Sequence, residues 1–180
     1  MTSKVTKLKP RHKPAAALDT PTDLAPEAVK DVSKALNTIL ADSYALYLKT
    51  KNFHWHVSGP HFRSYHLLFD EQAAAILANT DDVAERVRKI GGTTLKSIGD
   101  ISKFQTIEDN DDDFVEPSAM LRELMEDHKK IVKFLREAHG IADDHKDVAT
   151  ASLIENWIDE AEKRLWFLFE AGRGADRAGH

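Results

Sequence analysis

The chain has 180 residues, a formal net charge of −5 and no cysteine. A chain of this length forms one domain with an ample core. The lack of cysteine excludes disulfides, thiolate metal ligands and iron–sulfur clusters, and it fits a reducing cytoplasm. No apolar run approaches the roughly 18 residues of a membrane span, and no long apolar segment follows the basic N-terminus, as a secretory signal requires.

Positive charge is concentrated at the N-terminus. Residues 1–14 contain no acidic residue and five basic ones, which are Lys4, Lys7, Lys9, Arg11 and Lys13. The rest of the chain therefore carries −10, because +5 lies in this segment and the whole chain carries −5. Prolines and the lack of apolar periodicity predict a flexible tail over residues 1–21. We expect one domain over residues 22–171 and a second flexible tail over residues 172–180.

Four long amphipathic helices are predicted between the two tails. Apolar residues recur at i, i+3, i+4 and i+7 spacing over about 25–57, 61–89, 117–139 and 146–171. The connection from 91 to 116 leaves room for a short helix near 94–101. Because no strand pattern is present, the sequence predicts an all-α four-helix bundle of ferritin-like connectivity, with a short extra helix between the second and third long helices.

Proline and glycine mark the predicted helix ends. Pro26 suits a first helical turn. The Ser-Gly-Pro segment at 58–60 predicts a tight reversal, and the Gly-Gly pair at 91–92 and Gly140 predict the ends of the second and third helices. The first two helices should therefore run antiparallel about a turn near residue 60.

Two pairs of metal-ligating side chains lie in mirror positions on the second helix. His66/Asp70 and Asp81/Glu85 are each i,i+4 pairs, and the two pairs share one midpoint. At roughly 100° per residue, all four side chains fall in a stripe about 100° wide. Each pair can contact one metal, but residues 70 and 81 are separated by about 16 Å of helix. The two pairs therefore cannot meet in one chain.

A two-fold axis at that midpoint would bring the pairs together. Two helices crossing antiparallel there place His66 and Asp70 of one copy beside Asp81 and Glu85 of the other. Small side chains that allow a close approach surround the crossing, and they are Ala73, Ala74, Ala75 and Ala78. We therefore expect a homo-oligomer with paired metal sites across a two-fold interface.

His54 completes the half-site. Positions 54 and 66 are equidistant from the turn, so they should face each other across the hairpin. Two imidazoles and three carboxylates without sulfur suit Fe(II), with Mn and Zn as competitors. Oxygen-rich sites favour iron that becomes ferric, because hard donors stabilise the higher charge. An isolated His/Asp pair would more simply be a surface contact, but the symmetric repetition favours a metal site.

Three further aromatic residues are expected to lie outside this ligand set. His56 lies about 200° around the helix from His54, so it faces solvent or another subunit. His128 falls on an apolar stripe, where a hydrogen-bonded core histidine is expected. Trp55 either packs against its surroundings or donates an electron to an oxidising iron.

A dense group of motifs supports a specific relationship. They are the segment Asn-Phe-His-Trp-His-Val-Ser-Gly-Pro-His-Phe at 52–62, His66, Asp70, the segment Asp81–Arg86, the Ile-Gly-Gly segment at 90–92 and the Leu-Trp-Phe segment at 165–167. Together they closely resemble the signature of the Dps family, the DNA-binding proteins of starved cells or mini-ferritins. The resemblance covers roughly residues 25–170. It implies a hollow shell of twelve four-helix bundles that oxidises Fe(II) at two-iron sites, usually with hydrogen peroxide rather than oxygen, and stores ferric mineral.

The resemblance also assigns the ferroxidase ligands. They fall on His54, His66 and Asp70 of one subunit and on Asp81 and Glu85 of its two-fold partner. Larger ferritins build the site inside one bundle with Glu-x-x-His, and this motif is absent from the sequence. The resemblance thus implies the same five residues as the symmetry argument.

Two further features have family counterparts. Acidic three-fold pores that admit iron lie near the start of the fourth helix in the family, where Asp144 and Asp147 stand here. The alternative is a helix N-terminus enriched in acids to match its dipole. In some Dps proteins a lysine-rich N-terminal tail binds DNA, and the five basic residues within 4–13 resemble it. Such a tail would bind phosphate without sequence preference and with steep salt dependence.

The sequence therefore predicts a cytoplasmic, nucleoid-associated ferroxidase that stores iron and protects DNA, with no membrane partner. The alternative is a structural nucleoid protein that coats DNA and uses Zn or Mn at the same ligands mainly for assembly. A merely solubilising tail remains the alternative to DNA binding.

Overall fold

The structure is a computed structural model that describes residues 18–174. Its helices, in chain order, are α1 (Pro26–His56), α2 (Phe62–Ala78), α3 (Thr80–Lys89), α4 (Ile98–Phe104), α5 (Pro117–Asp144) and α6 (Val148–Gly172). No strand occurs within residues 18–174, which confirms the predicted all-α fold. No helix in this part of the chain combines the length and apolar character needed to cross a membrane. The predicted tail of residues 1–21 lies largely outside the described residues.

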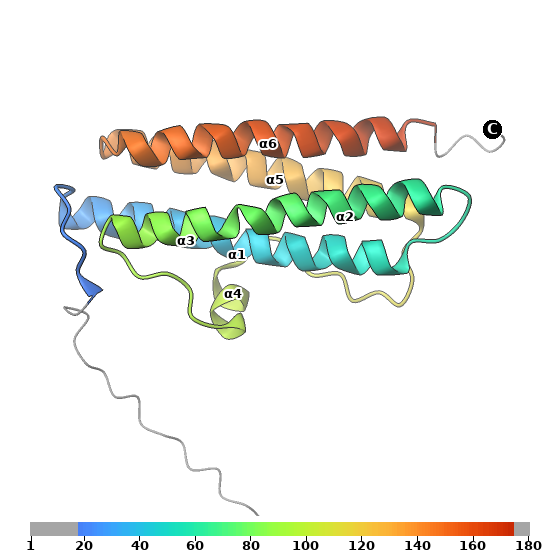
Figure 1. Ribbon diagram of the computed structural model, residues 1–180, viewed down its shortest axis with the longest axis horizontal. Helices are drawn as coiled ribbons and strands as arrows, with labels where there is room; N and C mark the ends of the chain where they lie inside the picture. Colours follow the sequence, from blue (N-terminus) through green and yellow to red (C-terminus); the bar gives the residue numbers. More distant parts are fainter. Residues whose placement is uncertain (1–17, 175–180) are drawn as a thin grey trace, which may run out of the picture.

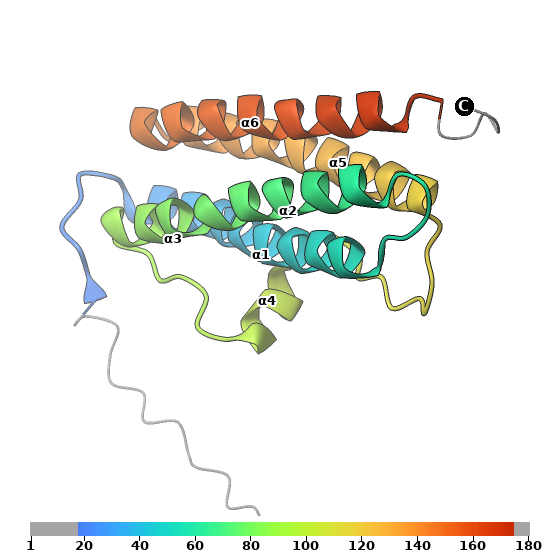
Figure 2. The same ribbon diagram turned by 45° about the vertical axis from the view of Figure 1, so that its right-hand side comes forward.

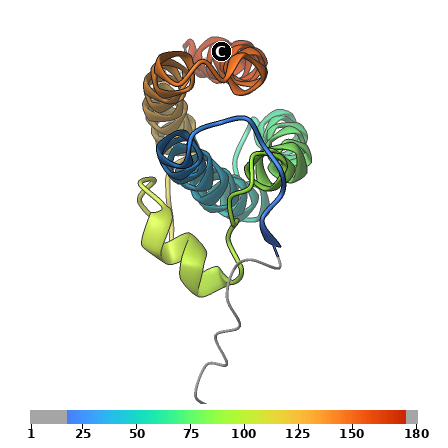
Figure 3. The same cartoon turned by 90° about the vertical axis from the view of Figure 1, so that its left-hand side faces the viewer.

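The long helices form two antiparallel hairpins that pack as a four-helix bundle. α1 returns as α2 and α3, which follow one another along nearly one line (Figures 1 and 2). α5 packs against both α1 and α6. Viewed end on, α4 lies on the outer side of α1, away from α6 (Figure 3). The long connection that carries α4 therefore crosses from one hairpin to the other, as the sequence predicts.

The turn between α1 and α2 sets the level of the whole hairpin. The N–H of Val57 donates to the carbonyl oxygen of Phe53 at 2.8 Å and closes α1. Gly59 has φ +97°, a left-handed conformation that glycine adopts without a steric cost. Phe53 on α1 and Phe69 on α2 are both buried in the same one of two apolar clusters. This packing fixes how α1 and α2 face each other.

The second predicted helix is interrupted at Asn79, so the prediction of one continuous helix over 61–89 is wrong at this residue. The hydroxyl of Thr80 donates to the carbonyl oxygen of Leu77 at 2.7 Å, and the amide of Asn79 donates to Glu160 on α6. The Thr80 bond competes with the regular helical ladder for a backbone carbonyl, and the Asn79 bond connects the break to α6. The break leaves each i,i+4 pair intact, with one pair in α2 and the other in α3.

Two other boundaries differ from the prediction. Gly140 does not end the third long helix, because α5 continues to Asp144 and buries an alanine on each side of the glycine. The left-handed residue that follows the helix is Lys146, with φ +60°. The short helix begins at Ile98 rather than near 94, because the hydroxyl of Ser97 caps it by accepting from the N–H of Asp100 at 3.2 Å.

Candidate metal centre

His54 and His66 face each other across the α1–α2 hairpin. Their rings stack with centroids 3.8 Å apart. The Nδ1 of His54 lies 2.7 Å from the carbonyl oxygen of His66, and the Nδ1 of His66 lies 2.8 Å from the carbonyl oxygen of His54. The prediction that the two positions face each other is therefore confirmed, and each ring is held by the backbone of the other helix.

These two hydrogen bonds determine where the lone pairs lie. A carbonyl oxygen can only accept, so each Nδ1 carries the proton and each Nε2 is left as an acceptor. A histidine whose Nδ1–H is bound to a carbonyl is oriented for metal binding through Nε2. The two imidazoles therefore have the tautomer that a divalent metal requires.

Asp70 lies beside His54 and is held by a lysine. Its Oδ1 is 3.9 Å from the Nε2 of His54 and 2.7 Å from the Nζ of Lys51. The pKa of Asp70 is lowered, chiefly by the hydrogen bond from Lys51. Two ligands that each lie about 2.1 Å from one metal are about 3 Å apart at a right angle and about 4.2 Å apart on opposite sides. The His54–Asp70 separation therefore fits one divalent ion.

Asp81 and Glu85 form the second pair, on the exposed surface of α3. Glu85 is bound by Lys89 one turn later, at 3.0 Å. Within residues 18–174, no three His, Cys, Asp or Glu side chains are grouped closely enough to hold a metal ion. His54, His66 and Asp70 therefore do not form a three-ligand group in one chain, and the ligand roles of all five residues stay predictions.

The surface around the ligand pairs is apolar and exposed. Leu67 and Leu77 are 42% and 39% exposed, and Ala74 is exposed between them. At about 100° per residue, all three lie within roughly 100° of His66 on α2. Ala73 is fully buried in its own bundle, whereas Ala74, Ala75 and Ala78 are exposed, and the crossing that they are expected to surround stays a prediction. The exposed apolar side chains make this face a candidate for the predicted two-fold contact.

Known proteins share this architecture and are similar to the chain in sequence. The family model of the ferritin-like domain matches residues 33–171. A low temperature-induced protein of a Nostoc species is 35% identical over 146 residues, which cover 81% of this chain and 82% of that protein. The DNA protection during starvation protein of Agrobacterium fabrum is 32% identical over 149 residues, 83% of this chain and 92% of its own. DpsC from Streptomyces coelicolor has a TM-score of 0.81 at 29% identity, over 84% of this chain and 89% of its own. The chain belongs to the Dps family of ferritin-like proteins.

In this Dps chain, Trp55 is exposed beside the candidate centre. Its ring lies 5.9 Å from the Nζ of Lys51, the lysine that binds Asp70. His56 points elsewhere, and its Nδ1 lies 2.8 Å from the carbonyl oxygen of Asn52 one turn earlier. Lys51 therefore contacts both Trp55 and Asp70, and the role of Trp55 as an electron donor stays a prediction.

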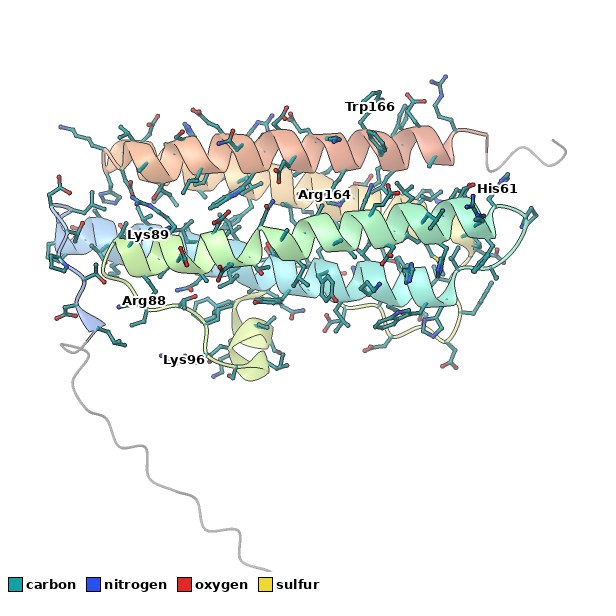
Figure 4. All side chains as sticks on the ribbon, viewed as in Figure 1. His61, Arg88, Lys89, Lys96, Arg164 and Trp166 are labelled. Atoms are coloured by element: carbon teal, nitrogen blue, oxygen red, sulfur yellow. The ribbon has the colours of Figure 1, made fainter. Side chains whose placement is uncertain are left out.

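His128 is a core histidine, but without the expected hydrogen bond. It is fully buried, and neither ring nitrogen has a partner within residues 18–174. Burial, with a smaller contribution from the nearby charge of Arg164, lowers the pKa of His128 to about 3. Arg164 lies on the side of α6 that faces α2 (Figure 4), where its carbonyl oxygen accepts a hydrogen bond from Gln72 at 3.0 Å. The ring of His128 is therefore neutral at physiological pH.

Of the two residues expected at a pore, Asp147 is the N-terminal cap of α6. It is 3% exposed and accepts from the N–H of Thr150 at 3.1 Å and from Arg86 at 2.5 Å. Asp147 therefore fits the alternative interpretation, in which an acidic residue stabilises the N-terminus of the helix. Asp144 is exposed at the end of α5 and is the pore candidate that we retain. The five basic residues predicted to bind DNA lie outside the described residues.

The sequence did not point to two lysines that bind candidate ligands, Lys51 at Asp70 and Lys89 at Glu85. A signal for each was present. The hairpin relation that pairs 54 with 66 pairs 51 with 69, which is the neighbour of Asp70, and Lys89 lies four residues after Glu85.

Proposed function

We propose that this Dps chain is a ferroxidase subunit that oxidises Fe(II), preferentially with hydrogen peroxide, and stores the ferric product inside a hollow shell of twelve subunits. The observation that carries the proposal is the pair of reciprocal hydrogen bonds between His54 and His66. These bonds leave both Nε2 lone pairs available, and the Nε2 of His54 lies 3.9 Å from the Asp70 carboxylate, on a surface that one chain leaves incomplete.

The missing oxygen ligands come from a second copy. Asp81 and Glu85 of the partner subunit reach His54, His66 and Asp70 when two α2–α3 segments cross about a two-fold axis. Exposed Leu67 and Leu77 on the same face supply apolar contact for that crossing. Each two-fold interface then contains two equivalent centres with a mixed imidazole and carboxylate ligand set that suits Fe(II).

The reaction follows from this ligand set. Two Fe(II) ions, which are the substrate, each give one electron to hydrogen peroxide. The O–O bond breaks, two protons are taken up, and two Fe(III) ions and two water molecules result, so no hydroxyl radical is released. The carboxylates stabilise the ferric product, because hard, anionic oxygen donors bind the higher charge more strongly.

A pair of adjacent aspartates tests the proposal. Asp81 lies on the ligand stripe, whereas Asp82, also exposed, lies about 100° further around the helix. We expect Asp81→Asn to slow anaerobic Fe(II) oxidation by peroxide about tenfold or more, since a ligand lost from a metal centre costs at least that much. Asp82→Asn should oxidise iron as the unaltered protein does. Equal rates for all three proteins would reject the proposed centre.

The identity of the metal ion at the centre distinguishes this function from the DNA-coating alternative. If the centre serves assembly through Zn(II) or Mn(II), oxidation of Fe(II) should be no faster than in protein-free buffer. Competition among the three metals under anaerobic conditions, followed by peroxide addition, distinguishes the two functions directly.

We also propose that the N-terminal tail binds DNA without sequence preference and that this contributes to DNA protection. Five cations and no acid lie within residues 1–14, and several tails on one particle add avidity. Removing residues 2–14 should abolish retardation of DNA in a gel at low salt while iron oxidation continues. Retardation that survives the truncation at the same salt would show that another surface binds DNA.

A further inference from the structure

One carboxylate oxygen of Asp70 is placed to serve two cations. The Nζ of Lys51 lies 2.7 Å from Oδ1 of Asp70, and the Nε2 of His54 lies 3.9 Å from the same oxygen. Because the Nδ1 of His54 is already a donor, its Nε2 is free to bind a metal. The Asp70 oxygen that lies beside the Nε2 of His54, and so suits a divalent ion shared with that ring, is therefore the one that accepts the hydrogen bond from Lys51.

Lys51 is part of the centre rather than a solvated surface charge. Its side chain is 17% exposed, and it lies one helical turn before His54 on α1. The second lysine differs, because Lys89 and Glu85 are 57% and 56% exposed. Lys89 extends from the end of α3 (Figure 4). Asp70 itself is 54% exposed, so the two ion pairs differ in the shelter of the ammonium group. A charged hydrogen bond from a sheltered ammonium is stronger than an exposed i,i+4 pair.

We propose that Lys51 is the counter-cation of Asp70 in the metal-free subunit and is displaced when a divalent cation binds, so that this lysine lowers the metal affinity of the centre. The inference rests on the proposed function, because it takes His54 and Asp70 as ligands. An ammonium group and a divalent ion on one oxygen repel each other strongly at such short range. The flexible stem of lysine allows the ammonium to leave, and the ring of Trp55 at 5.9 Å provides a nearby surface for it.

Zn(II) binding tests this displacement without any redox chemistry. Calorimetry of the assembled protein would compare the unaltered chain with Lys51→Met, which keeps the apolar stem, and Lys51→Gln, which keeps polarity. Both variants should bind Zn(II) about tenfold or more tightly, because the metal no longer breaks a charged hydrogen bond. Lys51→Arg keeps the charge and should bind weakly. Lys133→Met is the matched control, because Lys133 is an exposed lysine that pairs i,i+4 with Glu137, which is not a proposed ligand, and its Zn(II) affinity should change by no more than about threefold.

A ligand variant separates failure of this inference from failure of the proposed function. If Asp70→Asn loses Zn(II) at the centre and the neutral Lys51 variants bind no more tightly than the unaltered chain, Lys51 is not a competing cation and the inference is wrong. If Asp70→Asn and Asp81→Asn both bind Zn(II) as the unaltered chain does, the metal centre itself is wrong and the inference falls with it.

Discussion

At the scale of single residues, the interior of the bundle contains both paired and unpaired polar groups. Lys49 and Asp127 form a buried ion pair at 2.7 Å between α1 and α5. His128, the next residue along α5, is fully buried and has no hydrogen-bond partner within residues 18–174. A buried neutral imidazole is tolerated, but a buried imidazolium without a partner is costly. His128 is therefore a source of acid sensitivity.

We expect His128 to destabilise the fold as pH falls. Its pKa is about 3 in the folded chain and about 6.5 in the unfolded chain, so the unfolded state binds the extra proton between these values. The stability is fully present above pH 6.5 and is lost towards pH 3, at about 1.4 kcal/mol per pH unit for each subunit.

Denaturant unfolding at pH 7 and pH 5 checks this prediction. The variant His128→Met, which keeps a similar volume without a titrating group, should lose less stability between the two pH values than the unaltered chain, by about 2 kcal/mol. An identical loss in both proteins would assign the acid sensitivity to other groups.

Much of the centre is predictable from residue spacing alone. The turn at 58–60 pairs His54 with His66. The i,i+4 spacing pairs His66 with Asp70, and Asp81 with Glu85. The reciprocal Nδ1 bonds and the capture of Asp70 by Lys51 depend on side-chain rotamers and on the distance between α1 and α2. Periodicity contains no information on either quantity, so these contacts appear only in the three-dimensional structure.

At the scale of elements, apolar periodicity locates the long helices but not their interruptions. Gly140 is a residue type that is common at helix ends, yet packing of α5 against α6 outweighs the weak helix propensity of one glycine. Asn79 shows the opposite case. A helix-compatible segment is interrupted there, where the hydroxyl of Thr80 bonds the carbonyl oxygen of Leu77 and Asn79 bonds Glu160 on α6, a contact that the sequence pattern does not reveal.

Two glycine substitutions test this description of the elements. Gly140 is helical and a Cβ there meets nothing within 4 Å, so Gly140→Ala should stabilise the fold by up to about 1 kcal/mol. At Gly92 a Cβ would collide with the hydroxyl of Ser33, so Gly92→Ala should destabilise the fold by about 1–3 kcal/mol. Thermal unfolding measures both changes. A destabilising Gly140→Ala would mean that the helix ends at this residue.

At the scale of the whole molecule, a two-fold contact alone produces only a dimer. A shell also needs a heterologous contact that closes a ring around another axis. The C-terminal half of α6 offers a candidate surface, because Trp166, Phe167 and Phe169 are 60%, 44% and 51% exposed. Trp166 points away from the bundle (Figure 4). This aromatic surface lies on a different helix from the predicted two-fold face.

Substitution of Trp166 tests whether this surface closes the shell. Trp166→Glu places a charge in an apolar contact, and we expect it to leave dimers instead of the closed shell, as measured by analytical ultracentrifugation. Trp166→Phe keeps an aromatic ring and should retain the shell. A closed shell of unchanged mass with Trp166→Glu would place the second contact elsewhere.

The central claim is that each iron centre is shared between two subunits, and co-assembly of two inactive variants tests it most directly. One variant carries His66→Ala and Asp70→Asn, and the other carries Asp81→Asn and Glu85→Gln. When they assemble together in equal amounts with random pairing, about a quarter of the centres receive both intact halves. The measurement is the initial rate of Fe(II) oxidation by peroxide. We predict that the mixed assembly recovers about a quarter of the unaltered rate, whereas a mixed rate no higher than that of either variant alone would contradict a shared centre.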